Sequence, residues 1–185
     1  MTDHGITIAG IEIPSNSTLF LTIVGFHVFV ALVCVATGPV AMLSRKGPGR
    51  HPTFGTIYYW FLLAVFASAT VLAVMRWAED YHLFILGALS FGAASLGRAA
   101  RRRHWAGWAN VHIPGMGFSY VVLVTAFYVD NGKSLLLWKD LPHITYWLLP
   151  SLVGVPLIVR ALVRYRHSPL DEGALSESPL PPPGG

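Results

Sequence analysis

The chain has 185 residues, of which 54% are hydrophobic and 12% are charged, and its mean hydropathy is +0.54. Soluble globular domains carry about 25% charged residues, so this composition excludes an ordinary soluble domain and indicates an integral membrane protein. The formal net charge of +4 does not indicate a nucleic-acid partner, because the basic residues take the positions that membrane topology requires. The predicted partner is the lipid bilayer.

Five apolar segments follow one another along the chain, and a helix needs about 20 residues to cross the hydrocarbon core. The sequence therefore predicts an all-α, five-helix transmembrane bundle with spans over 18–43, 54–75, 81–98, 105–129 and 143–163. The third apolar run is short, and Tyr81 and the stem of Arg98 extend it at its two ends. Its many glycine, alanine and serine residues allow close helix packing, which predicts a central position for this helix.

Basic residues are distributed unevenly between the predicted loops. Ten of the 13 Lys and Arg follow the first, third or fifth predicted helix: Arg45, Lys46, Arg50, Arg98, Arg101, Arg102, Arg103, Arg160, Arg164 and Arg166. Because Lys and Arg accumulate in short cytoplasmic loops, the N-terminus is predicted to lie outside and the C-terminus in the cytoplasm.

The two ends of the chain are predicted to lie outside the bundle. Residues 1–17 form an outside tail, in which four isoleucines suggest a segment on the membrane interface. Residues 168–185 are rich in proline, glycine and serine and poor in apolar residues, so a disordered cytoplasmic tail is predicted.

Histidines within apolar segments are the candidate functional residues, because an ionisable side chain at membrane depth costs free energy unless it has a partner. At about 1.5 Å per helical residue, His27 lies on the outer side and His112 on the cytoplasmic side of the membrane midplane, on the order of 13 Å apart. They are therefore poor candidates for the two axial ligands of one haem. Height divides the histidines into an outer set (His27, His82, His143) and an inner set (His51, His104, His112).

Helical bundles with histidines on facing helices can bind haem iron or a transition metal. The candidates for cofactor or metal binding are His27, His51 and His112, with Met116, Tyr58 and Tyr120 as weaker cofactor-binding candidates because they share helix faces with these histidines. Weaker metal candidates are His82, His104, His143 and Cys34. A Cu(I) site is a further alternative, since imidazole, thioether and thiolate suit that ion. Structural hydrogen bonding, quinone binding and proton transfer by the same histidines stay open.

No enzyme motif is present, so whether the protein is an enzyme stays open. The sequence has no glycine-rich phosphate loop, no His-Glu-x-x-His motif and no Asp or Glu within a predicted span. The lack of acidic residues in the spans counts against a proton pump or a cation transporter, which usually need intramembrane acids.

Several short motifs together resemble a known family. They are His27 with Gly38-Pro39, the run from His51 to Tyr58, the run from His112 to Tyr120, and Thr125-Ala126-Phe127. This set resembles the bacterial membrane-protein family of domain of unknown function 2306, over about residues 20–165. The resemblance implies a multi-pass protein of the bacterial cytoplasmic (inner) membrane and no established activity. A more distant likeness to small proteins associated with haem-copper oxidase assembly implies a respiratory-complex partner.

Three functions are compatible with these observations. The first is a small haem- or metal-binding redox protein that uses its buried histidines. The second is a scaffold or assembly factor without chemistry, which packs on a membrane complex or on a second copy of the chain. The third is a transporter of a small solute or of protons.

Overall fold

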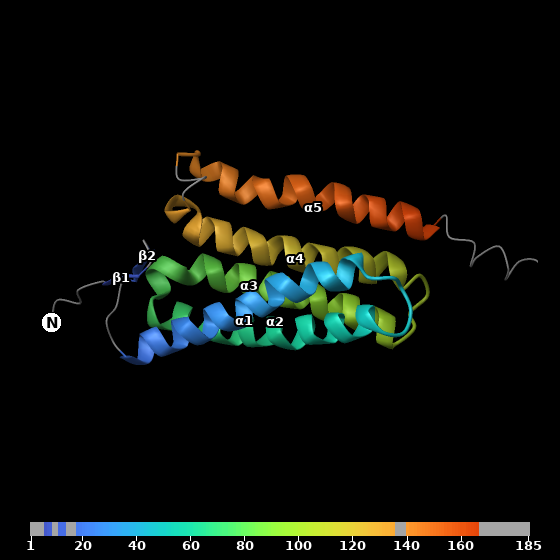
Figure 1. The fold of residues 1–185 in the computed structure, drawn as a ribbon, viewed down its shortest axis with the longest axis horizontal. Helices are drawn as coiled ribbons and strands as arrows, with labels where there is room; N and C mark the ends of the chain where they lie inside the picture. Colours follow the sequence, from blue (N-terminus) through green and yellow to red (C-terminus); the bar gives the residue numbers. More distant parts are fainter. Residues whose placement is uncertain (1–5, 9–10, 14–17, 136–139, 167–185) are drawn as a thin grey trace, which may run out of the picture.

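A computed structural model of the chain describes residues 6–8, 11–13, 18–135 and 140–166. The elements are β1 (Ile6–Ile8), β2 (Ile11–Ile13), α1 (Thr18–Leu43), α2 (Arg50–Met75), α3 (Trp77–Arg102), α4 (Ala109–Asn131), the 3₁₀ helix η1 (Gly132–Ser134) and α5 (His143–Arg166) (Figure 1). Each of the five long helices is long and apolar enough to cross a membrane, which confirms the predicted number of such helices. The predicted tail over 168–185 lies outside the described residues.

Strands β1 and β2 form an antiparallel hairpin in which Ile6 pairs with Ile13. This hairpin lies in the N-terminal tail, and every other described element is a helix, so the all-α fold class is confirmed. Isoleucine alternates with other residues in each of these strands, and this period of two is typical of a strand. The hairpin was not predicted, because the isoleucines were considered for their apolar content alone.

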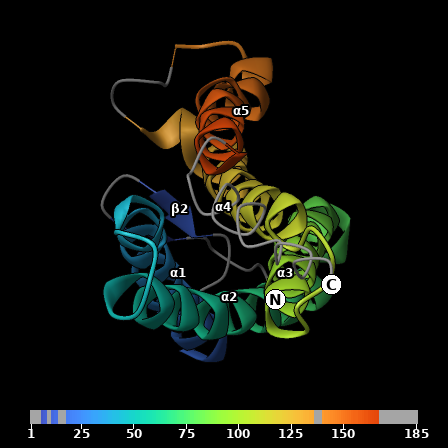
Figure 2. The ribbon, with the colours of Figure 1, turned by 90° about the vertical axis from the view of Figure 1, so that its right-hand side faces the viewer.

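Successive helices run in opposite directions along the bundle (Figure 1). Arg76 alone connects α2 to α3, with a backbone φ of −140° and ψ of 52°. Helices of this length span about 35–39 Å, which exceeds the roughly 30 Å hydrocarbon core. Helices α1 to α4 surround a shared interior, whereas α5 packs mainly on α4 (Figure 2).

Helix boundaries match the predicted spans closely at α1 and less well elsewhere. Helix α2 begins four residues before the predicted 54–75, α3 extends beyond 81–98 at both ends, and α5 extends beyond 163. Each of these extensions contains charged residues, and helical hydrogen bonding continues through them beyond the apolar run. The start of α4 is four residues later than the predicted 105, because His104 and Gly107 adopt positive φ values of 49° and 67°, and such values do not occur in an α-helix.

The interior of the bundle is apolar. Its core is made of Val30, Cys34, Tyr58, Leu62, Val65, Ala94 and Leu123, which come from α1 to α4. Large apolar side chains also cover the outside, as on α5, where Leu152 is 73% exposed. An apolar interior inside an apolar exterior fits a bundle surrounded by lipid.

Small residues bring α3 and α4 into backbone contact. A Cβ atom added to Gly115 would lie 2.9 Å from the carbonyl oxygen of Ala93, and one added to Gly97 would lie 3.2 Å from the carbonyl oxygen of His112. Helix α4 packs on α1, α3 and α5, whereas α3 packs mainly on α2 and α4. The central helix is therefore α4, and the predicted central position of the third helix is wrong. The small residues of α3 form one side of the close contact between α3 and α4.

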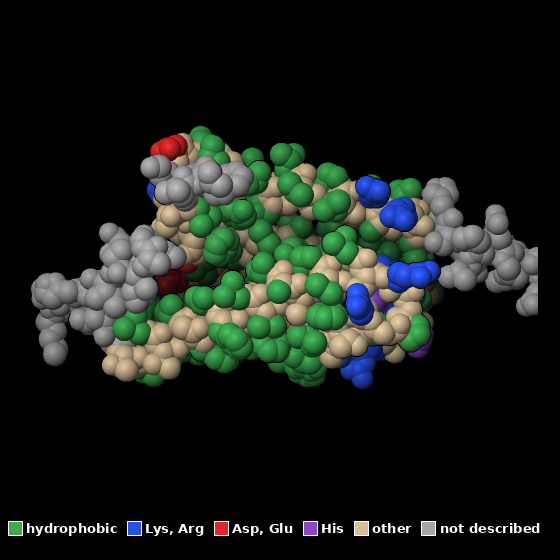
Figure 3. Space-filling model, in the orientation of Figure 1, with side chains coloured by type: hydrophobic (Ala, Val, Ile, Leu, Met, Phe, Trp, Pro, Cys, Tyr) green, Lys and Arg blue, Asp and Glu red, His purple; other side chains and the backbone are tan. Residues whose placement is uncertain are grey.

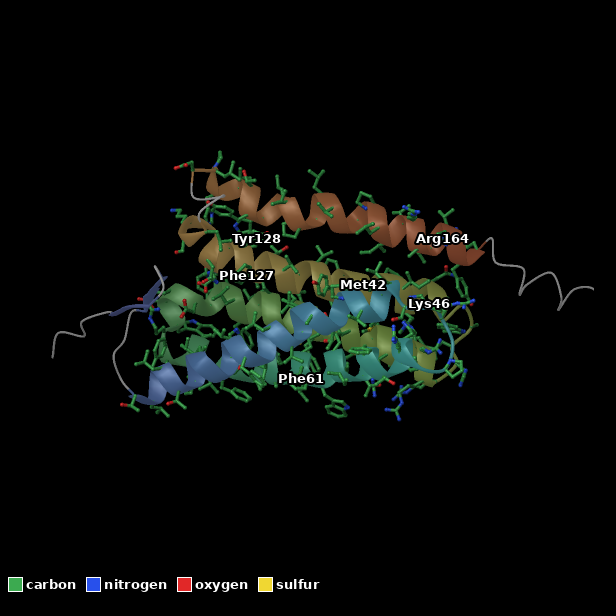
Figure 4. All side chains as sticks on the ribbon, viewed as in Figure 1. Met42, Lys46, Phe61, Phe127, Tyr128 and Arg164 are labelled. Carbon is green, nitrogen blue, oxygen red and sulfur yellow. The ribbon has the colours of Figure 1, made fainter. Side chains whose placement is uncertain are left out.

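The two ends of the bundle differ in charge (Figure 3). At the basic end, α1, α3 and α5 end, α2 and α4 begin, and Lys and Arg side chains gather together with histidine. At the opposite, acidic end lie the described carboxylates that follow α2 or end α4: Glu79, Asp80 and Asp130. Figure 4 places Lys46 just beyond α1 and Arg164 near the end of α5, both at the basic end.

Candidate functional site

At the basic end, the histidines that begin α2 and α4 face each other. His51 is the second residue of α2 and His112 the fourth of α4. Their ring centroids are 6.3 Å apart and their ring planes form an angle of 85°. The structure therefore brings together two of the three main candidates as one His51–His112 pair.

A backbone carbonyl orients each ring of the pair. The Nδ1–H of His51 donates to the oxygen of Ala41 over 2.8 Å, and that of His112 donates to the oxygen of Gly97 over 3.0 Å. A carbonyl oxygen only accepts, so the hydrogen of each neutral ring is on Nδ1 and the lone pair is on Nε2. Among the described residues, neither Nε2 has a hydrogen-bond partner and neither is fully buried. Metal-binding histidines usually have this arrangement, with the other ring nitrogen held by a carbonyl.

The contact between α3 and α4 positions the Gly97 carbonyl, which accepts the hydrogen bond from His112. Because Gly97 and Gly115 lack side chains, the backbones of the two helices touch at this level. The carbonyl of Gly97 then reaches the imidazole of His112, which lies one turn before Met116 on α4. The small residues of α3 were predicted to allow close packing, but the Gly97 carbonyl was not predicted as a functional group.

Two cations lie beside the His51–His112 pair. Arg101 and Lys46 interact electrostatically with both imidazoles. The Arg101 guanidinium lies over the ring of Trp108, 4.8 Å from its centroid, and that ring is 5.9 Å from the His112 ring. Lys46 donates to the carbonyl of Met42 over 2.9 Å, and partial burial lowers the pKa of its ammonium. The site therefore carries positive charge, and the described carboxylates of the helices are at the other end.

The predicted tyrosines lie deeper in the bundle, and the hydroxyl of each makes a hydrogen bond. Tyr58 lies seven residues after the α2 histidine, and its hydroxyl is 2.9 Å from the Ser119 hydroxyl, which itself donates to the carbonyl of Met116. Tyr120 donates to the carbonyl of Val35 over 3.1 Å, and the two tyrosine rings are 6.2 Å apart. These hydrogen bonds form a layer that connects α1, α2 and α4. The layer lies deeper in the bundle than the His51–His112 pair.

His27 is remote from the pair. Its Nδ1 is 2.8 Å from the hydroxyl of Ser68, which lies 17 residues after His51 on α2, about 25 Å farther along the helix. The predicted separation of His27 from His112 is confirmed. The predicted depth difference of 13 Å is too small, because α4 begins at Ala109 and His112 lies in its first turn.

The copper set predicted from His112, Met116 and Cys34 is not assembled. Cys34 is fully buried in the core, and its thiol points to the carbonyl of Tyr58 over 3.7 Å. In the described segments, no group of three or more His, Cys, Asp or Glu is placed to hold a metal ion. His104 lies on the exposed loop before α4 and makes no described contact with the pair, so only two of the three inner histidines meet.

His82 and His143 line a pocket of about 380 Å³ at the acidic end. They share this pocket with three carboxylates and three other residues: Glu79, Asp80, Asp130, Tyr81, Val129 and Trp147. The His82–His143 pocket and the His51–His112 pair are therefore at opposite ends of the bundle, but His27, which was predicted to belong with His82 and His143, does not line their pocket.

Comparison with family models, with curated proteins and with solved structures found no match for this chain. The resemblance to the family of domain of unknown function 2306 therefore stays a prediction. The argument for function rests on the geometry of the two histidines.

Proposed function

We propose that the protein is a membrane-embedded haem protein that transfers electrons, in which His51 and His112 would hold one haem. The single observation that supports this is the imidazole pair, in which a carbonyl holds each Nδ1–H and each Nε2 is left without a protein partner. We place the basic end at the cytoplasmic face of the bacterial inner membrane by the positive-inside rule.

The spacing of the rings supports a group held between them. The ring centroids of His51 and His112 are 6.3 Å apart, which is roughly the separation expected for two imidazoles that bind one metal through bonds of about 2.0–2.1 Å.

Charge and ligand number favour haem over a bare metal ion. The described residues supply no third His, Cys, Asp or Glu ligand near the pair, and protein sites for zinc usually need three or four. Arg101 and Lys46 would repel an unpaired divalent cation, whereas they attract the carboxylates that haem carries. Haem also brings its own four equatorial nitrogens, so two protein ligands are enough.

The ligand set favours electron transfer over oxygen chemistry. When bound, haem supplies a one-electron redox centre whose potential depends on its axial ligands and surroundings. Because His51 and His112 would both be used to hold the haem, neither imidazole would be free to act on a substrate. The Gly97 and Ala41 carbonyls orient the two rings, and the tyrosine layer closes the site from below. A membrane-bound respiratory complex is the proposed electron partner.

An absorption spectrum tests this proposal. We expect the protein, purified from cells supplied with haem, to show a Soret band, and His51→Ala and His112→Ala each to lose most of it. His104→Ala is the matched control, because it removes an exposed imidazole at the same end and should keep the band. Circular dichroism checks that each variant is still helical.

Two results would change the assignment. A folded wild-type protein without a Soret band, but with a stoichiometric metal that both variants lose, would make the pair a bare metal site. A folded protein with neither haem nor metal would exclude redox chemistry at the pair and leave the scaffold as the better function.

A further inference from the structure

The bend between α1 and α2 forms a largely apolar pocket of about 580 Å³. The apolar part of its lining comes from Pro39, Val40 and Leu43 of α1 and from Pro48 of the connection. Two arginines, Arg45 and Arg50, also line it. The pocket thus combines apolar surface at membrane depth with guanidinium groups at the membrane surface.

The connection between α1 and α2 makes a turn that favours glycine. Gly47 and Gly49 have φ values of 145° and 113°, which L side chains rarely adopt. The hydroxyl and backbone N–H of Thr53 both donate to the carbonyl of Gly49 at the start of α2. Arg45 follows the end of α1 and Arg50 begins α2, so the turn has one arginine on each side of its two glycines.

The positive charge at this pocket is not neutralised within the described residues. Arg45 and Arg50 are exposed and form no ion pair there, and the ion pair that is present joins Arg76 to Asp80 at the acidic end. Leu43 beside them is 87% exposed. A ligand that satisfies both parts of the pocket needs an anionic group and an apolar chain.

We propose that this pocket is a binding site for one anionic phospholipid. Arg45 and Arg50 bind the headgroup phosphate, because the guanidinium fork matches phosphate oxygens in geometry and charge. The acyl chain lies along Val40 and Leu43, which continue the lipid-facing surface of α1. This site is separate from the haem proposal, since its test needs no haem.

Native mass spectrometry of the full chain in detergent tests the site, with phosphatidylglycerol and phosphatidylcholine as probes. We expect the wild type to retain one phosphatidylglycerol in preference to phosphatidylcholine. The double variant Arg45→Gln/Arg50→Gln should lose affinity for phosphatidylglycerol by about 10- to 30-fold, as expected from losing two exposed ion-pair contacts to the headgroup phosphate. Arg102→Gln/Arg103→Gln is the matched control. It removes two arginines at the same end, outside the pocket, and should bind as the wild type does.

Two further experiments distinguish binding of a whole lipid from binding of a free phosphate anion and from general attraction to the basic surface. Leu43→Asn should weaken phosphatidylglycerol binding while both arginines remain, whereas inorganic phosphate at equal concentration should not displace the lipid. Displacement by inorganic phosphate would show that the site takes the headgroup anion alone. Equal losses in the two double variants, or equal binding of the two lipids, would reduce the site to general surface attraction and overturn the proposal.

Discussion

Two histidines on helices lie at each end of the bundle, but in different surroundings. Helices α2 to α5 each have a histidine within their first six residues: His51, His82, His112 and His143. Because successive helices alternate in direction, the α2 and α4 histidines meet at the basic end and the α3 and α5 histidines at the acidic end (Figure 1).

What differs is the support around each pair. At the basic end, two carbonyls hold the rings at a ligand-like separation, and cations surround them. At the acidic end, the two histidines line an open pocket together with carboxylates, and the described residues show no ring contact between them. A histidine's position in a helix therefore does not define a site. The groups that orient its ring define the site.

The largest effect expected from this difference concerns haem content. His51→Ala or His112→Ala should remove most of the haem, whereas His82→Ala/His143→Ala should leave the haem-to-protein ratio unchanged, because neither of those two rings belongs to the proposed ligand pair. The pyridine haemochrome assay gives this ratio. Loss of half or more of the haem in this double variant would move the site to the acidic end or require a second one.

A smaller effect is expected from widening the contact between α3 and α4. Gly97→Ala places a Cβ 3.2 Å from the His112 carbonyl oxygen and should separate the helices. We expect a cost of about 1–3 kcal/mol, as for other overpacked sites, together with weaker haem retention. Thermal unfolding in detergent and the Soret absorbance measure the two effects.

Gly92→Ala provides the control for that variant on the same helix. No atom lies within 4 Å of a Cβ added at Gly92, so stability and haem content should stay as in the wild type. Equal effects of the two alanine substitutions would contradict the close contact at Gly97.

The smallest effect is expected from the ion pair at the acidic end. Arg76 Nη1 and Asp80 Oδ2 are 3.8 Å apart, and both side chains are partly exposed. Partly exposed pairs contribute about 0–1 kcal/mol, so Arg76→Gln should change the unfolding temperature by no more than a few degrees. A large loss of stability would mean that Arg76 holds the connection between α2 and α3 by more than this pair.

Helix number and approximate limits were predictable because apolar length alone decides whether a segment can cross a membrane. Thr18–Leu43 was predicted to the residue, since polar residues bound the apolar run at both ends. The start of α4 was not predicted to the residue, because Trp105 and Trp108 belong to the apolar run. The positive φ values of His104 and Gly107 interrupt helical geometry there. The hairpin of β1 and β2 was missed for a similar reason, since apolar content was considered without its period.

By itself, the sequence determined the five helices, the distribution of charge between the two ends, and the separation of His27 from the α4 histidine. These properties depend on composition and on counting residues along one chain. Only the tertiary structure decided that His51 and His112 face each other, that His104 does not join them, and that the carbonyls of Ala41 and Gly97 hold the two rings. The reason is that backbone carbonyls carry no sequence signal, and their positions depend on how closely neighbouring helices approach.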